Sequence, residues 1–337
     1  MGNSESGIVD KLPPNFPNDI KFYHFHNLCN TCYCNSVIQL LLASNYVSCF
    51  FKNLFLVTKE GKALVVQEIL QSPLFQLLQI YQNSVDDSNK EREFFIKPIK
   101  FLDSIYRETD QFTKGQQHDA HEFIIYLISS FDEVIKKFND IHGKTLTPPF
   151  SKLFEGVKAT CFHCELCEND KERQEPFISL DLGILPQSNL QNLVDESLFP
   201  EIVEEDWKCD NCSQKSEAQI TSYMAQLPPV LLIELQRFKY NRQTQRMEKN
   251  SEIVKIPNEI HINSGSGPQN YKLKAIICHI GISLFHGHFI AFSKVDEKWL
   301  LANDDNLNVL DQITFEQLLE GRNVKYQYVP YLLMYEC

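Results

Sequence analysis

Two stretches in the first half of the chain carry apolar side chains at the i, i+3, i+4, i+7 spacing of a helix with one buried face. The first stretch consists of Cys34, Val37, Ile38, Leu41 and Leu42. The second consists of Phe123, Leu127, Phe131, Val134 and Phe138. We therefore expect a mainly helical region from about residue 30 to about residue 140, interrupted by a polar loop at 81–93.

The pattern changes after Pro148 and Pro149, where short β-like runs replace the helical spacing. The run at 230–235 is apolar apart from Glu234 and directly follows a pair of prolines, which is typical of a buried strand. Further strands are predicted at 273–278, 288–293, 298–301 and 331–335. Helices followed by a largely antiparallel sheet indicate the α+β class rather than alternating βαβ units.

Composition places the chain among ordinary globular proteins, with 337 residues, 43% hydrophobic and 23% charged. The formal net charge of −12 argues against nucleic-acid binding, which usually needs a basic surface. The sequence contains 11 cysteines, and its first residues show no signal-peptide pattern. We therefore expect the cysteines to be catalytic or metal-binding thiols of a protein in the cytoplasm or the nucleus.

The N-terminal region offers little evidence for membrane attachment. Residues 1–20 read as an arm, and Gly2 begins a short myristoylation pattern that no basic cluster reinforces. No stretch reaches the roughly 18 apolar residues that a spanning helix needs. We expect no stable membrane insertion, and a monomer.

Cys32 is the candidate nucleophile because it lies where the first predicted helix begins. Asn30 or Thr31 can cap that helix, and the positive end of the helix dipole favours a thiolate. Asn27, five residues upstream, offers an amide donor for an oxyanion. Each feature alone also has a structural explanation: a small buried cysteine, and an asparagine that stabilises a turn.

His288 is the candidate base, at the start of a predicted strand. If the next strand pairs with it, Asn303 or Asp304 at that strand's end can reach the imidazole and fix its tautomer. His279 and His286 are rival bases, and a structural role for His288 also stays open.

Two cysteine pairs, Cys161-x-x-Cys164 and Cys209-x-x-Cys212, predict a closed four-sulfur zinc site with a structural role. His163 and Cys167 lie nearby and are alternative ligands.

Several segments together resemble the ubiquitin-specific proteases, in that family's order and over roughly residues 21–337. They are NLCNTCYCNS at 27–36, QQHDAHEF at 116–123, LPPVLLIELQRF at 227–238, YKLKAIICH at 271–279, GHF at 287–289 and WLLANDD at 299–305. The resemblance implies a papain-like cysteine protease fold. Its thumb would span about 21–140, its zinc-bearing fingers about 150–225 and its palm about 226–337.

The resemblance also implies roles for individual residues. Cys32 would attack the bond after the C-terminal glycine of ubiquitin, His288 would act as base and Asn303 would orient it. Asn27 would line the oxyanion hole, and Asp304 would assist. Asp119 resembles the family acid that contacts the basic ubiquitin tail. The small members activated by WD-repeat proteins are the most similar, from chain size and the RFKY run at 237–240.

Three positions depart from the family pattern. Cys29 stands where a glycine is usual, and a side chain there restricts the backbone. Phe289 replaces a frequent tyrosine, and Asn303 replaces a frequent aspartate. The alternatives are therefore a catalytically silent ubiquitin binder, a protease for another ubiquitin-like modifier and, least favoured, a general papain-like peptidase.

Overall fold

The computed structural model describes residues 24–59, 66–85, 95–143, 145–186, 188–197, 201–203, 207–215, 218–265, 267–283, 286–295, 298–310, 312–320 and 328–337. The predicted arm at 1–20 and Gly2 lie outside the described residues.

The first half of the described chain is helical, as predicted. The helices are α1 (Cys32–Leu42), α2 (Asn45–Lys59), α3 (Gln67–Leu70), α4 (Pro73–Val85), α5 (Ile99–Glu108) and α6 (Ala120–His142). Every residue of α1 is buried, so this helix is a core element rather than an amphipathic surface helix. Helix α6 begins at an Asp119 cap and ends at Gly143, whose φ of 64° provides the left-handed residue of a C-cap.

One predicted loop is wrong in part. Residues 81–85 belong to α4, and 86–94 lie outside the described residues. Tyr81 is buried because it extends the apolar face of Leu74, Leu77 and Leu78. The polar composition of the segment hid this continuation.

The second half supplies most of the strands. The bounds are β1 (His24–Phe25), β2 (Phe95–Ile96), β3 (Gly156–Cys164), β4 (Asp170–Phe177), β5 (Ser179–Leu182), β6 (Glu201–Val203), β7 (Ala218–Gln226), β8 (Val230–Leu235), β9 (Phe238–Asn241), β10 (Arg246–Lys249), β11 (Glu259–Ser264), β12 (Gly267–Ser283), β13 (His286–Val295), β14 (Lys298–Asn303), β15 (Asn306–Leu310) and β16 (Val329–Glu336). Three short helical segments join them: η2 (Phe150–Leu153), α7 (Leu190–Glu196) and α8 (Gln312–Leu319). The five strands predicted from the sequence are confirmed as β8 and parts of β12, β13, β14 and β16.

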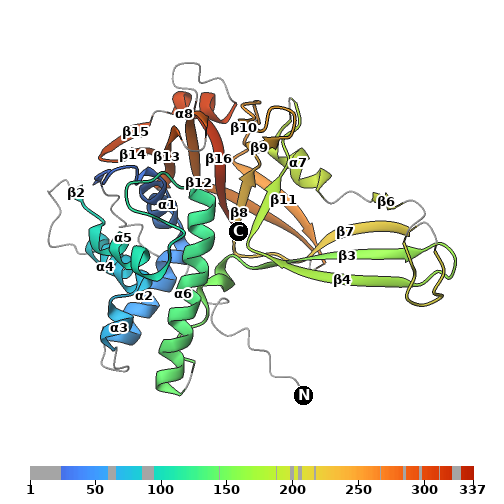
Figure 1. Cartoon of the computed structure of the whole chain (residues 1–337), viewed down its shortest axis with the longest axis horizontal. Coiled ribbons are helices and arrows are strands. Elements are labelled where there is room, and N and C mark those ends of the chain that lie inside the picture. Colours follow the sequence, from blue (N-terminus) through green and yellow to red (C-terminus); the bar gives the residue numbers. More distant parts are fainter. Residues whose placement is uncertain are drawn as a thin grey trace.

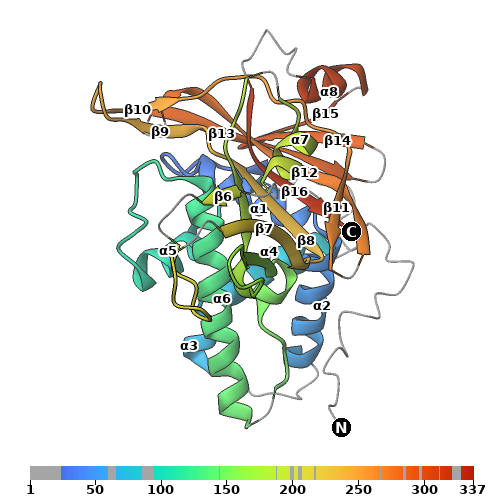
Figure 2. The same cartoon turned by 90° about the vertical axis from the view of Figure 1, so that its right-hand side faces the viewer.

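One large sheet runs through the described part of the chain in the order β15-β14-β13-β12-β11-β7-β3-β4, with β16 between β12 and β8 and with β5 beside β8. The β3, β4 and β7 ribbon extends far from the remainder of the sheet (Figure 1). Figure 2 shows β13, β14 and β15 above the helices, with α8 on the side of these strands away from the helices.

Alternation along the central strands creates two separate cores, one on each face of the sheet. In β8, Val230 and Leu232 join the core shared with α1 and α6, whereas Leu231 and Ile233 join the core shared with α7 and α8. This position between two cores explains why every residue of β8 except Glu234 is apolar.

Among the described residues, no single helix is both long and apolar enough to cross a membrane. Helices α1 and α2 satisfy the length and composition criteria only when joined, and they meet at 87°.

Candidate active site

Cys32 is the first residue of α1, and its side chain is 3% exposed. Thr31 occupies the N-cap position but makes no side-chain cap, because its hydroxyl accepts a hydrogen bond from the Leu28 N–H at 2.9 Å. The predicted capping by Asn30 is also wrong, since its amide donates to the Gly115 carbonyl at 2.9 Å. The helix dipole therefore acts on Cys32 without a capping side chain.

His288 joins Cys32 from across the fold. Its Nε2 lies 2.7 Å from Asn303 Oδ1, because β13 and β14 are antiparallel neighbours. A hydrogen bond with the Cys32 side chain is the main cause that raises the pKa of His288 to about 9; Asn303 and the charge of Asp304 also raise it, and burial opposes them. Because Nε2 contacts Asn303, Nδ1 is the ring nitrogen left for the thiol.

Asp304 serves the nucleophile side of the site more closely than it serves His288. Its Oδ2 accepts a hydrogen bond from Asn27 Nδ2 at 2.9 Å, and its Oδ1 accepts one from Asn35 Nδ2 at 2.7 Å. The same Oδ2 lies 3.8 Å from His288 Nε2, beyond hydrogen-bond distance. Of the two open alternatives for orienting the imidazole, the geometry therefore favours Asn303.

The side-chain amide of Asn27 is fixed at both ends. Its Oδ1 accepts from the Thr31 N–H at 3.1 Å, and its Nδ2 donates to Asp304. One N–H of the amide remains for an oxyanion beside Cys32. The structure thus brings Cys32, His288, Asn303, Asp304 and Asn27 into one cluster.

The loop before the nucleophile adopts glycine-like backbone geometry in spite of its side chains. Cys29 has φ of 65° and Asn30 has φ of 63°, both in the left-handed region. Cys29 keeps the conformation that a glycine would adopt, at a cost in strain, and its own side chain is exposed.

Phe289 is buried and packs against the ring of His279, with centroids 5.0 Å apart. The His279 ring is fully buried, and burial is the main cause that lowers its pKa to about 3. His279, one of the two rival bases, is therefore a core residue, and the other, His286, is the first residue of β13.

Asp119 is 6% exposed and caps α6 by accepting from the N–H groups of His121 at 2.7 Å and Glu122 at 3.0 Å. Its second oxygen lies 2.6 Å from the Tyr331 hydroxyl. The carboxylate thus has a structural task in the free protein. Contact with a substrate tail stays a prediction for this residue.

Sequence reasoning assigned no role to the four polar side chains of a network next to Asp119, namely His121, Ser179, Asp181 and Glu234. His121 Nδ1 lies 3.2 Å from Glu234 Oε2, and its Nε2 lies 2.8 Å from Ser179 Oγ and 3.9 Å from Asp181 Oδ1. Although these groups are close enough to suggest a cation site, the two acids face different nitrogens of one ring, which suits a hydrogen-bonded network better. Only packing of α6 on β5 and β8 assembles it, so no local motif reveals it.

Four thiols at the tip of the β3, β4 and β7 ribbon form a metal-like cluster. Cys164 Sγ lies 4.0 Å from Cys212 Sγ, and Cys167 Sγ lies 3.7 Å from Cys209 Sγ. A tetrahedron with metal–sulfur bonds of about 2.3 Å has edges of about 3.8 Å, so these residues fit a four-sulfur ion site.

The prediction of Cys161 as a ligand is wrong, and Cys167 takes its place. Cys161 lies within β3, three residues before Cys164, so the two side chains point to opposite faces of the strand. Cys164 and Cys167 instead bracket a tight turn, in which Glu168 has φ of 53° and its N–H donates to the Cys164 carbonyl. Cys209 and Cys212 bracket an equivalent turn, with Ser213 at φ of 61°.

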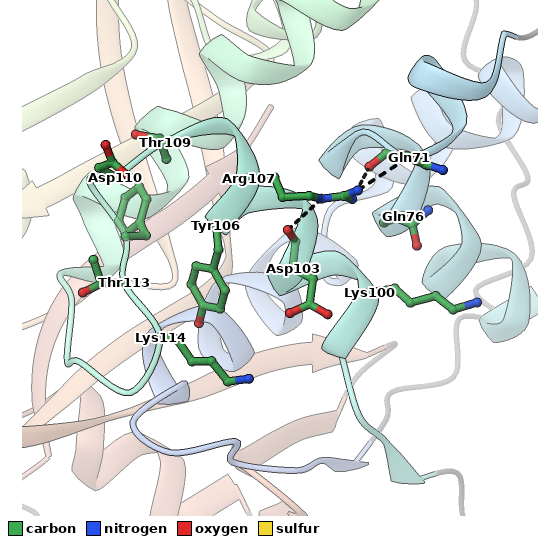
Figure 3. Close-up of a pocket in the computed structure, with 11 residues that line it drawn as sticks. Gln71, Gln76, Lys100, Asp103, Tyr106, Arg107, Thr109, Asp110, Thr113 and Lys114 are labelled. Carbon is green, nitrogen blue, oxygen red and sulfur yellow. Dashed lines mark hydrogen bonds between the residues drawn. The ribbon is translucent and has the colours of Figure 1, made fainter.

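A cavity of about 800 Å³ opens between α4, α5 and the segment that follows α5 (Figure 3). Lys100, Arg107 and Lys114 line it together with Asp103 and polar side chains. None of the predicted site residues lines this cavity.

A family model described as ubiquitin carboxyl-terminal hydrolase matches residues 23–335. Ubiquitin carboxyl-terminal hydrolase 4 of Arabidopsis thaliana is 26% identical over 370 residues, covering 100% of this chain and 99% of the relative. Ubiquitin carboxyl-terminal hydrolase 12 of Salmo salar is 27% identical over 365 residues, covering 100% of this chain and 95% of the relative.

Solved structures show the same fold. The SAGA DUB module Ubp8/Sgf11/Sus1/Sgf73 bound to monoubiquitin aligns with a TM-score of 0.79 at 20% identity, covering 98% of this chain and 72% of that chain. The same module bound to ubiquitin aldehyde aligns with a TM-score of 0.78, also at 20% identity, covering 97% and 72%. The predicted fold class is confirmed.

Proposed function

Because this chain belongs to the ubiquitin carboxyl-terminal hydrolase family, we propose that it is a deubiquitinating cysteine protease with Cys32 as nucleophile and His288 as acid and base. The observation that carries the assignment of residues is the continuous contact from Cys32 through His288 to Asn303 at the start of α1. The substrate bond is the peptide or isopeptide bond after the C-terminal glycine of ubiquitin.

The geometry supports a two-step acyl transfer. The Cys32 thiol proton passes to His288, and the thiolate attacks the scissile carbonyl. Negative charge then develops on the carbonyl oxygen, where the free N–H of Asn27 can donate. His288 returns its proton to the leaving amine, and the C–N bond breaks to leave a thioester. Water, deprotonated by His288, hydrolyses the thioester and restores the thiol.

The acidic groups around His121 suit the basic, extended ubiquitin tail. Asp181 is 48% exposed, and Glu234 lies beside it on the neighbouring strand β8. Burial raises the pKa of Glu234, and the charge of His121 opposes that shift. Asp181 is the most accessible carboxylate of the group, so we propose it as a tail contact alongside Asp119.

The metal at the tip of the ribbon would be zinc, because four thiolates in a tetrahedral arrangement with no open position suit a structural zinc ion. Cys164, Cys167, Cys209 and Cys212 would hold it. The ion would link the turn at Cys164–Cys167 to the turn at Cys209–Cys212 and so stabilise the tip of the ribbon. This tip is far from Cys32, so the ion would take no part in the reaction.

A WD-repeat activator remains a proposal that rests on the sequence resemblance at 237–240 and on chain size. Arg237 in that run is 1% exposed and donates to the carbonyls of Pro330, Asn250 and Glu252. Arg237 therefore has a structural role and lies too deep to contact a partner itself.

The test is labelling by a ubiquitin probe that carries a thiol-reactive group at its C-terminus, with wild type compared with Cys32→Ala. We expect a covalent adduct with wild type only. If folded wild type forms no adduct, alone or with a WD-repeat protein, a silent ubiquitin binder replaces the proposal. Parallel probes built on other ubiquitin-like modifiers, and short generic peptides, test the two remaining alternatives.

A further inference from the structure

His288 lies beside a pair of glycines on the β12–β13 hairpin. Gly281 in β12 is the register partner of Gly287 in β13, and the adjacent pair is Ile280 and His288. Any shift of the glycine pair therefore moves the imidazole relative to Cys32. Two side chains from outside the hairpin hold this pair, one on each strand.

Gln117 holds the Gly287 strand. Its Nε2 donates to the Gly287 carbonyl at 2.8 Å, and its Oε1 accepts from the Gly287 N–H at 3.1 Å. Both bonds fall on the residue directly before His288. Gln117 lies between α5 and α6, so it crosses from the helical half of the molecule to the sheet.

The same short segment also reaches the nucleophile loop. The Gly115 carbonyl accepts from Asn30 Nδ2 at 2.9 Å, two residues before Cys32. His118, next to Gln117, packs edge-on against the Tyr33 ring at 5.3 Å. The segment from Gly115 to His118 thus contacts chain neighbours of both Cys32 and His288.

Lys249 holds the Gly281 strand. Its Nζ donates to the Gly281 carbonyl at 2.7 Å and to the His279 carbonyl at 3.1 Å, and it lies 2.9 Å from His279 Nδ1. Lys249 is the last residue of β10, so the hairpin of β9 and β10 is tied to the end of β12. Among the described residues no carboxylate forms an ion pair with it, so carbonyls and a ring nitrogen are its partners.

Only glycine fits at either position of the pair. Gly281 has φ of 112°, and a Cβ on Gly287 would lie 2.0 Å from His279 Nε2. The backbone packs this closely at Gly281 and Gly287, the same two residues that accept hydrogen bonds from Lys249 and Gln117. Space and hydrogen bonding together define one position for the strand that carries His288.

We propose that Gln117 and Lys249 are positioning residues that hold the imidazole of His288 opposite Cys32 by clamping the Gly281–Gly287 pair from opposite sides. This inference rests on the proposed function for its kinetic consequence. The positioning of His288 relative to Cys32 does not depend on ubiquitin, so it can be tested without a substrate.

The chain contains a matched control. Gln191 makes the same two-bond contact with the His261 backbone, donating at 2.9 Å and accepting at 2.9 Å, on α7 and β11. Gln191→Ala removes these two hydrogen bonds, and a third that Nε2 donates to Asp195 Oδ1 at 3.0 Å, without approaching Cys32. It therefore measures the structural cost of losing such a contact.

The experiment compares Gln117→Ala, Lys249→Met, their double variant and Gln191→Ala on two readouts. The first is the pH dependence of Cys32 alkylation by iodoacetamide, followed by mass spectrometry of the peptide. The second is kcat and KM for ubiquitin with a fluorogenic C-terminal amide. We expect both single variants to lower kcat about 10- to 100-fold with little change in KM, and to shift the alkylation profile. The double variant should lose less than the product of the two single losses, because the clamps act on one pair.

The proposal is overturned if both single variants match Gln191→Ala on both readouts, or if their losses only track unfolding. Gln117→Glu, which keeps the acceptor and loses the donor, is the second variant if Gln117→Ala does not fold. If both Gln117 variants unfold while Gln191→Ala does not, the contact serves stability and the proposal is again overturned. Failure of wild type to cleave ubiquitin would overturn the proposed function, while the alkylation profile would still decide on the clamp.

Discussion

The carboxylate of Asp304 accepts a hydrogen bond from the side-chain amide of Asn27 at 2.9 Å, across 277 positions of the chain. Its neighbour Asn303 contacts His288 instead. In the proposed mechanism, two adjacent residues at the end of β14 therefore support opposite halves of the reaction: Asn303 orients the base, and Asp304 holds the oxyanion donor.

Replacing Asp304 by alanine should free the Asn27 amide and weaken oxyanion stabilisation. We expect kcat to fall about 10- to 100-fold with KM nearly unchanged, because the amide acts on charge that develops only in the transition state. Steady-state kinetics with a fluorogenic ubiquitin substrate measure this. A larger effect on KM than on kcat would contradict this role.

Removing Cys32 should lower the pKa of His288. The hydrogen bond with Cys32 is the main cause that raises this pKa to about 9, so Cys32→Ala removes the dominant stabilisation of the imidazolium. Because the raised pKa belongs to a base, the associated stabilisation is complete below about pH 6.5 and is lost as pH rises through about 9. NMR titration of the His288 ring in both proteins checks the shift, and an unchanged pKa would refute it.

Cys167 and Cys161 should respond differently to mutation. Cys167→Ser removes a proposed ligand, so bound zinc should fall from about one per chain to well below that, with a lower unfolding temperature. Cys161→Ser should retain the metal, because its side chain faces away from the cluster. Elemental analysis of the purified proteins decides, and metal loss in the Cys161 variant would restore that residue as a ligand.

Cys29→Gly should stabilise the protein slightly. A left-handed conformation costs a residue with a side chain about 1–2 kcal/mol, and glycine avoids that cost while losing about 0.4–1 kcal/mol through greater unfolded-state freedom. The net expectation is a gain of about 0.5–1 kcal/mol in the free energy of unfolding, with activity retained. Urea denaturation measures it. A destabilised variant would show that the Cys29 side chain makes a contribution of its own.

Periodicity identified the elements that matter most for the site. The buried face of α1, the long apolar face of α6 and the largely apolar run of β8 each carry a strong local pattern, and all three form as predicted. The polar end of α4 was missed because burial of Tyr81 depends on neighbouring helices rather than on local composition.

The choice between Cys161 and Cys167 illustrates a different limit. Both lie three residues from Cys164, so spacing alone fits either pair. Backbone geometry decides, since the left-handed Glu168 after Cys167 matches Ser213 after Cys212, whereas Cys161 lies inside a regular strand. Such a turn is not visible in spacing.

Contacts between distant segments lay beyond sequence reasoning altogether. Gln117 belongs to a recognised motif, yet its bond to Gly287 spans 170 positions and follows only from docking of the helices on the sheet. The same holds for Lys249 and His279, where a hairpin is folded back onto a neighbouring strand.

The position of β16 has a consequence for the newly made protein. This strand, at Val329–Glu336, lies between β12 and β8 in the middle of the sheet. On the ribosome, Cys32 emerges roughly 300 residues before β16. Strand β11 pairs with β12 at residues 267–272, but residues 273–279 of β12, next to the strand of His288, have no partner on that side until β16 is made. A nascent chain therefore has its thiol long before it has a firmly held base.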